Sequence, residues 1–162
     1  LTPLSKCLNL RELDLYKNEI TDGSPLKNLA NITRLNISNN SISDISYVKD
    51  MVNLNSFNTG GNTITNISSI RSLVNLEILA IGGAELTDIS PVSDLTKLRV
   101  LGLNSNKITS IQPIKTLVTL KTINIESNCI TDFSPIDYLK ENGKLTSVQG
   151  DSANDQDYSR CE

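Results

Sequence analysis

Four aspartates lie 22 residues, or a multiple of 22 residues, apart in the sequence. Carboxylates bind divalent cations, so these aspartates are the first side chains whose type and position could do chemistry. They are Asp22, Asp44, Asp88 and Asp132. Each also stands where a short helix would begin, and there a carboxylate can accept backbone N–H groups. We therefore expect these aspartates to cap helices, and we predict no metal site.

Histidine is absent from the chain. The protein therefore lacks a side chain that titrates naturally near neutrality, the Ser-His-Asp and Cys-His nucleophile pairs, and the imidazole metal ligand. Carboxylate or lysine chemistry would need a concentrated cluster of such side chains, and none stands out. We predict a protein that is not an enzyme, has no catalytic residue and needs no cofactor.

The three cysteines, an odd number, do not make a disulfide framework. Cys7 lies on an apolar column of the repeat described below, so we predict that it is a buried small side chain. Cys129 and Cys161 lie outside that pattern and could pair or stay free.

The charge of the chain limits its partners. The formal net charge is −3, and no cluster of Lys and Arg stands out along the sequence. Nucleic-acid binding needs a basic surface that neutralises phosphates, so we expect no nucleic-acid partner. No apolar run approaches the ~20 residues of a membrane span, and no signal peptide opens the chain. We expect no membrane span in this fragment, and the oligomeric state stays open.

A 22-residue repeat must position these side chains. In six successive copies apolar residues recur at fixed positions, and five copies also carry an asparagine. The asparagines are Asn18, Asn40, Asn62, Asn106 and Asn128, and the remaining copy has Ala84. The pattern, L-x-x-L-x-L-x-x-N-x-I, is the leucine-rich repeat signature. Its L-x-L alternation predicts a short strand, and the asparagine predicts a turn whose backbone groups are bonded by the amide.

A second motif follows the strand in several copies. It reads Thr-Asp-Ile-Ser-Pro-Val at residues 87–92, with related stretches at 21–26 and 131–136. Serine before proline predicts an N-cap and an N1 proline, which would open one or two helical turns on the outer side. We therefore predict an α/β solenoid, a curved leucine-rich repeat array with a parallel concave β-sheet and short 3-10 or α-helical turns on the convex side.

The predicted leucine-rich repeat domain spans residues 1–148, with about six 22-residue repeats and partial terminal repeats. Residues 1–4 fall in register with 23–26, so we expect a fragment whose N-terminal cap is absent. Residues 137–143 lengthen the last outer helix, and Leu145 and Val148 resume the strand three residues late. Residues 149–162 form a polar C-terminal tail, which we expect to be loose or to lead into another domain.

The constant repeat length and the Asp-x-Ser-Pro element resemble the internalin-type repeats of bacterial surface proteins, over residues 1 to about 148. The resemblance implies a solenoid that binds a host or extracellular protein on its concave face, at the cell surface or after secretion. Cytosolic leucine-rich repeat proteins that regulate phosphatases also have 22-residue repeats, so a cytoplasmic regulatory subunit of an enzyme is the alternative. A structural spacer that presents a neighbouring domain is a third hypothesis.

The concave face is the predicted ligand-binding site. If L-x-L points into the core, the intervening residues face the ligand, and copies three to five carry no charge there. Two Gly-Gly pairs adjoin apolar side chains in these copies, which predicts a shallow apolar hollow within a polar rim. The candidate ligand-binding residues are Glu12, Asp14, Tyr16, Arg34, Asn36, Asn58, Ile78, Ala80, Gly82, Val100, Gly102, Asn104, Asn124 and Glu126.

A purely structural interpretation of the same residues stays open. Glycine after a short strand could serve only to permit a positive φ, and Ala84 could mark a turn closed by a glycine or a water. Ile78 and Val100 also suit a strand by propensity alone. Tyr16 is either an anchor at the rim or an ordinary exposed tyrosine.

Overall fold

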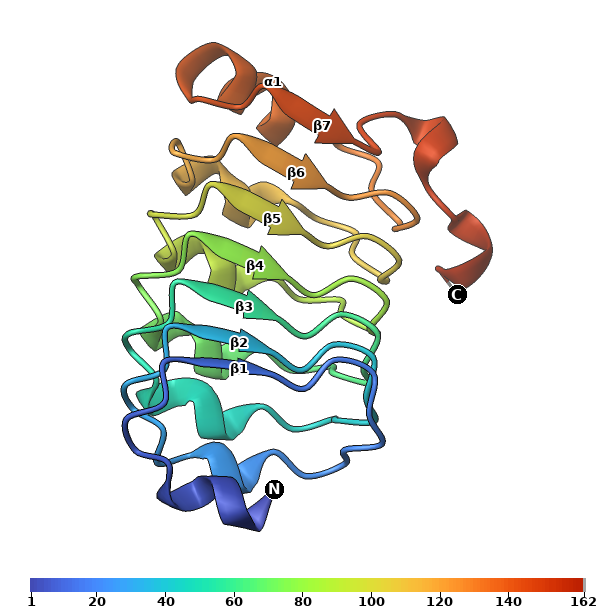
Figure 1. Ribbon diagram of the computed structural model, residues 1–162. Helices are drawn as coiled ribbons and strands as arrows, with labels where there is room; N and C mark the ends of the chain where they lie inside the picture. The colour runs from blue at the N-terminus through green and yellow to red at the C-terminus, as the bar shows by residue number, and fades with distance from the viewer. Residues whose placement is uncertain (162) are drawn as a thin grey trace.

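One parallel sheet runs the length of the molecule, and each repeat adds one three-residue strand to it (Figure 1). The computed structural model describes residues 1–161, apart from the side chain of Arg160. The strands are β1 (Glu12–Asp14), β2 (Arg34–Asn36), β3 (Ser56–Asn58), β4 (Ile78–Ala80), β5 (Val100–Gly102), β6 (Thr122–Asn124) and β7 (Ser147–Gln149). Neighbouring strands pair one repeat apart until the last pair, where Thr122 lies beside Ser147. The late return of the terminal strand is confirmed.

Short helical turns form the second layer behind the sheet (Figure 1). The 3-10 turns of this layer are η1 (Thr2–Lys6), η2 (Ser24–Leu26), η3 (Ser46–Asp50), η4 (Ser68–Ser72), η5 (Ser90–Asp94) and η6 (Gln112–Thr116), and its α-helix is α1 (Ser134–Asn142). Two further 3-10 turns, η7 (Ala153–Asp155) and η8 (Tyr158–Arg160), lie in the C-terminal tail beside the sheet (Figure 1). The curved solenoid with a parallel sheet on its concave side is therefore confirmed. No helix within residues 1–161 is long and apolar enough to span a membrane.

The residues that begin these turns differ from the prediction. Ser90 is the first residue of η5 rather than its N-cap, which is Ile89. Asp88 instead accepts the Ser90 backbone N–H at 2.7 Å and the Ser90 hydroxyl at 3.1 Å. The same bond to a serine N–H recurs at Asp22, Asp44 and Asp132. The aspartates thus organise the start of each turn, because an aspartate carboxylate readily accepts the backbone N–H two residues on.

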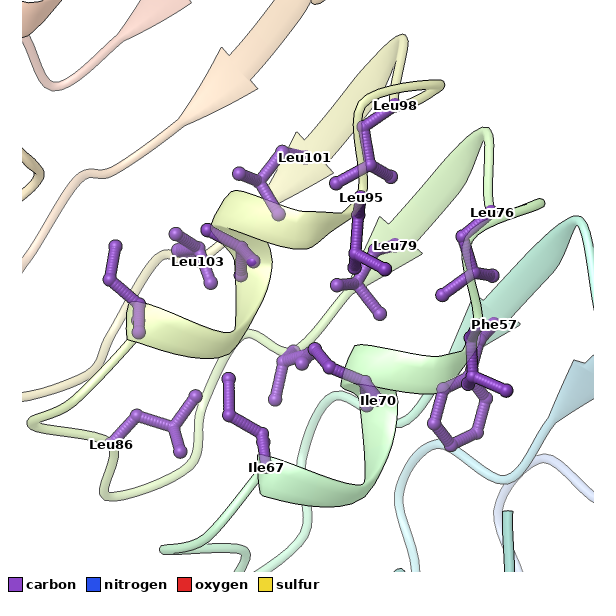
Figure 2. Close-up of a cluster of buried hydrophobic side chains, with 14 of the residues drawn as sticks. Phe57, Ile67, Ile70, Leu76, Leu79, Leu86, Leu95, Leu98, Leu101 and Leu103 are labelled. Carbon is purple, nitrogen blue, oxygen red and sulfur yellow. The ribbon is translucent and has the colours of Figure 1, made fainter. Parts of the chain in front are cut away.

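The core lies between the two layers. Figure 2 shows side chains from the strands, such as Leu79 and Leu101, meeting Ile70 and Leu95 from the helical layer. All four are almost fully excluded from solvent. Burial of each such side chain supplies about 1.5–3 kcal/mol, and in the inner repeats the side chains of the repeats on either side complete this burial.

The prediction that Cys7 is buried is wrong, because Cys7 is a free and exposed cysteine. The later members of its column, from Leu29 through Leu139, are buried at 0% exposure. Cys7 lies in the first repeat, where no described repeat packs against its outer side. Leu10 and Leu13 in the same repeat are only partly buried for the same reason.

A ladder of asparagine side chains joins the repeats at the turn after each strand. Asn106 Oδ1 accepts the backbone N–H of Leu86, and its Nδ2 donates to the carbonyls of Ile81 and Leu103. Asn40, Asn62 and Asn128 repeat this arrangement. The predicted role of these asparagines is therefore confirmed.

The polar tail is ordered against the last repeat rather than loose. Gln156, 9% exposed, takes the place of a further ladder asparagine: its Oε1 accepts the Ile130 N–H and its Nε2 donates to the Ile125 carbonyl. A disulfide joins Cys129 to Cys161, so these two cysteines pair rather than stay free. The tail folds back because its polar groups satisfy turn atoms that would otherwise lack partners.

Ala84 interrupts the ladder, and no bond equivalent to that of Asn106 reaches the backbone N–H of Ile64 within residues 1–161. The backbone there matches the other turns, since Gly83 has φ +67° and Gly61, beside Asn62, has φ +68°. We expect Ala84→Asn to raise the free energy of unfolding by about 1 kcal/mol, because its amide would bond Ile64 N–H and nearby carbonyls. Urea denaturation measures this change.

Ala84→Asp is the matched control for this prediction. Aspartate has the same shape but offers a second acceptor where the ladder needs a donor, so we expect it to destabilise the protein. If both substitutions lower the unfolding midpoint equally, the backbone at Ala84 does not fit the ladder.

Candidate protein-binding surface

Strands β4 and β5 place two apolar side chains side by side in the middle of the concave face. Ile78 pairs with Val100 in register, and Ala80 pairs with Gly102. Ile78 is 43% exposed and Val100 is 38% exposed. Their neighbours at the same level are Ser56 on β3 and Thr122 on β6. We call the surface formed by Ile78, Ala80, Gly82, Val100 and Gly102 the central hollow.

Strands β1, β2, β3 and β6 end in a side-chain turn that β4 and β5 lack. Asp14, Asn36, Asn58 and Asn124 each accept the backbone N–H two residues later through Oδ1. Ala80 and Gly102 occupy this position on β4 and β5, and neither has an acceptor to offer. Within residues 1–161, the N–H groups of Gly82 and Asn104 therefore have no such partner. They are backbone donors beside an apolar surface.

The two glycines of the 82–83 pair have different roles. Gly83 has φ +67°, but Lys17, Asn39, Ser105 and Ser127 adopt positive φ at the equivalent position, so the turn does not require glycine there. Gly82 does not have positive φ. A Cβ on Gly82 would lie 2.5 Å from Asn104 Oδ1, so glycine lets the neighbouring side chain lie over it. Positive φ alone thus does not explain why residues 82 and 83 are both glycine.

The N-terminal part of the concave face is polar. A hollow of about 420 Å³ lies over β1 to β3, with Glu12, Asp14, Arg34, Asn36 and Asn58 in its lining. Asn36 Nδ2 donates to Asp14 Oδ1 at 3.1 Å. Arg34 forms no salt bridge within the described chain, although it pairs in register with Glu12.

The remaining candidates lie at the edges of this face. Tyr16, directly after β1, is 52% exposed. On β6, Asn124 donates to Gln149 Oε1 at 2.7 Å, so its amide is partly committed to the terminal repeat. Glu126 is exposed directly after β6. All the residues selected from the sequence thus lie on or just after the strands of one face.

A cluster of basic residues that is not evident along the sequence forms in the fold, and the sequence analysis missed it. A groove of about 330 Å³ on the side where the strands begin is lined by Glu77, Lys97, Arg99, Thr119, Lys121 and Lys144. We call it the basic groove. Its cations come from successive copies of the repeat, since Lys97 and Arg99 precede β5, Lys121 precedes β6 and Lys144 precedes β7. The column directly before each strand could have identified Arg99 and Lys121.

Within the described residues, no group of three or more acidic, cysteine or histidine side chains is arranged to hold a metal ion. The candidate aspartates of the 22-residue column bond serine N–H groups instead. The pKa values of Asp22 and Asp132 are lowered, chiefly because their carboxylates accept the N–H of Ser24 and Ser134.

Comparisons with known proteins identify the repeat. The family described as Leucine Rich repeats (2 copies) matches residues 8–54 and 96–138. A comparison with curated proteins finds no match. Internalin C2 from Listeria monocytogenes is 33% identical with a TM-score of 0.88, and the match covers 92% of this chain and 65% of that protein.

Two further solved structures are also similar to this chain. A second internalin from Listeria monocytogenes is 28% identical over 91% of this chain and 50% of its own length, with a TM-score of 0.82. A leucine-rich repeat protein from Leptospira interrogans is 26% identical over 89% of this chain and 38% of its own length, with a TM-score of 0.81. This chain therefore spans less than two thirds of each of these proteins.

Proposed function

Because the chain belongs to the leucine-rich repeat family and has repeats of the internalin type, we propose that it is a non-enzymatic protein-binding module whose ligand docks on the central hollow. Leucine-rich repeat proteins are typically interaction modules. The whole ligand-binding surface would extend over the charged residues on either side, from Glu12 and Arg34 to Glu126.

The observation that carries this proposal is the difference between β4–β5 and their neighbours. Among the strands within residues 1–161, only β4 and β5 combine an exposed apolar side chain, Ile78 or Val100, with a position that lacks a polar side chain, Ala80 or Gly102. An apolar centre inside a polar rim is the usual anatomy of a protein interface. Covering Ile78 and Val100 would contribute about 1.5–3 kcal/mol each, which is the size of binding hot spots.

We further propose that the protein acts at a bacterial surface or after secretion. The Listeria internalins support this context by similarity. The Cys129–Cys161 disulfide supports it independently, because disulfides persist in oxidising compartments and are rare in the cytosol. The same observation weighs against a cytosolic phosphatase-regulating subunit, and the exposed hot-spot pair weighs against a spacer.

The test is affinity capture with the immobilised domain from extracellular and host-surface protein, and in parallel from cytosolic lysate. We expect Ile78→Glu/Val100→Glu to reduce capture of the extracellular partner by roughly 10- to 100-fold, since both apolar contacts are replaced by charge. Val52→Glu is the control for placing a charge at an exposed apolar position. Val52 is 46% exposed in the turn before β3, away from the concave surface.

Four results would separate the hypotheses. Capture by wild type and by the Val52 variant, but not by the double variant, supports the central hollow. Equal capture by all three proteins would overturn it. A partner taken only from the cytosolic fraction would favour the regulatory subunit, and no partner from either fraction would favour the spacer.

A further inference from the structure

The central hollow and the basic groove form one continuous surface. A depression of about 290 Å³ is lined by Ile78, Val100 and Thr122 together with Glu77, Arg99 and Lys121. The last three also line the basic groove. A ligand that covers Ile78 and Val100 therefore meets Arg99 and Lys121 next, and beyond them Lys97 and Lys144.

The cations of the basic groove are available to a ligand. Lys97 donates to the neutral amide of Asn75, and Arg99 lies 3.5 Å from Glu77, an exposed pair that water screens. Lys121 and Lys144 form no salt bridge within the described residues. Four cations against one carboxylate thus gather on one surface of a chain whose net charge is −3.

We propose that this surface binds an acidic segment of the partner protein. A large apolar side chain of the segment lies on Ile78 and Val100, and neighbouring Asp or Glu carboxylates lie over Lys97, Arg99, Lys121 and Lys144. The proposal rests on the proposed function, and it names the chemistry of the ligand at the same site. Electrostatic complementarity of this kind sets specificity and accelerates association.

A protein segment fits the surface better than a nucleic acid does. Glu77 lines the groove at its β4 end and lies beside Arg99, so the row of basic residues that a phosphate backbone would follow stops there. Ile78 and Val100 offer a phosphate no partner, whereas they suit an apolar side chain. Nucleic-acid binding also depends on many phosphate contacts spread along a basic surface, and here the basic residues adjoin a single apolar pair.

A phage-displayed library of random dodecapeptides tests the proposal without assuming a sequence. Selection on the wild-type domain is expected to enrich peptides that carry several Asp or Glu residues and at least one large apolar residue. For a synthetic enriched peptide, Lys121→Glu/Lys144→Glu should raise Kd at least ~10-fold. The affinity should also fall as salt rises, because exposed charges are screened.

Lys27→Glu/Lys49→Glu is the matched control, because it makes the same change in net charge at exposed lysines in the outer layer. It should leave Kd within about twofold, since charges on the far side of the fold are screened. Enrichment of neutral or basic peptides, no enrichment, or equal loss of affinity in both variants would overturn the proposal. So would a 20-base-pair DNA duplex that binds at the basic groove more tightly than the peptide.

The same experiment separates this inference from the proposed function. Peptides that lose affinity with Ile78→Glu but not with Lys121→Glu/Lys144→Glu would retain the central hollow as the site and reject the acidic segment. Peptides insensitive to both changes would reject both.

Discussion

Asn106→Ala is expected to lower the free energy of unfolding by about 3 kcal/mol. Asn106 is fully buried, and two of its hydrogen bonds reach the preceding repeat, from Leu86 N–H at 3.1 Å and to the Ile81 carbonyl at 2.8 Å, while a third reaches the Leu103 carbonyl of its own turn at 2.9 Å. Alanine would leave these buried groups without their partner, and each such group costs roughly 1–3 kcal/mol. Urea unfolding followed by circular dichroism measures the loss.

Asn18→Ala is the control for this prediction. Asn18 is exposed in the first repeat, and its amide bonds only the carbonyls of Leu15 and Tyr16. Water can replace those bonds, so we expect a loss below about 1 kcal/mol. Equal effects of the two substitutions would mean that the buried ladder does not hold the repeats together.

Removal of the disulfide is the second large effect. Cys129 and Cys161 close a segment 32 residues apart in sequence. A crosslink of this span stabilises a fold by about 3–4 kcal/mol in the chain-entropy account, because it restricts the unfolded chain. We therefore expect Cys129→Ser/Cys161→Ser to lower the free energy of unfolding by that amount.

The loss should be concentrated in the last repeat. The tail is also held by Tyr158, whose hydroxyl donates to the Ile130 carbonyl at 2.8 Å, and by the Ser127 N–H, which donates to the Asp155 carbonyl. Hydrogen exchange at Ser127 and Ile130 should accelerate in the double variant, while exchange in β3 stays slow. Cys7→Ser, which removes an exposed free thiol, should change neither measurement. Unfolding midpoints that do not differ between oxidised and reduced protein would contradict the prediction.

The sequence predicted the features that recur in every copy of the repeat. Buried columns, strand positions and the asparagine turns all follow from side-chain type at fixed spacing, so Leu79, Leu101 and Asn106 could be placed before the structure was known. The error at Cys7 arose at an end of the array. The sequence pattern still marks Cys7 as a core position there, but no neighbouring described repeat covers its side chain.

The features that break the period could not be read in this way. Gln156 follows Asn128 by more than one repeat length, so nothing in the pattern marked it as a rung of the ladder. The disulfide depends on the fold of the same tail. The unpaired N–H groups of Gly82 and Asn104 follow from missing acceptors at Ala80 and Gly102, which only the turn geometry of the other strands reveals.

The binding affinity of Ala80→Asn/Gly102→Asn for the captured partner tests the central claim most directly. Asn36 and Asn58 already stand side by side on β2 and β3. The new pair would give β4 and β5 the same turns, bonding the Gly82 and Asn104 N–H groups and covering the hollow. A Cβ on Gly102 meets Ala80 Cβ at an ordinary 3.6 Å.

Isothermal titration measures the Kd of this variant, and thermal unfolding measures its stability. We predict that Kd rises at least ~10-fold, because the new amides displace the apolar contact. The free energy of unfolding should stay the same or rise by about 1 kcal/mol for each of the two new hydrogen bonds. A stable variant that binds as tightly as wild type would contradict the account, since the bare centre of the sheet would then have no part in recognition.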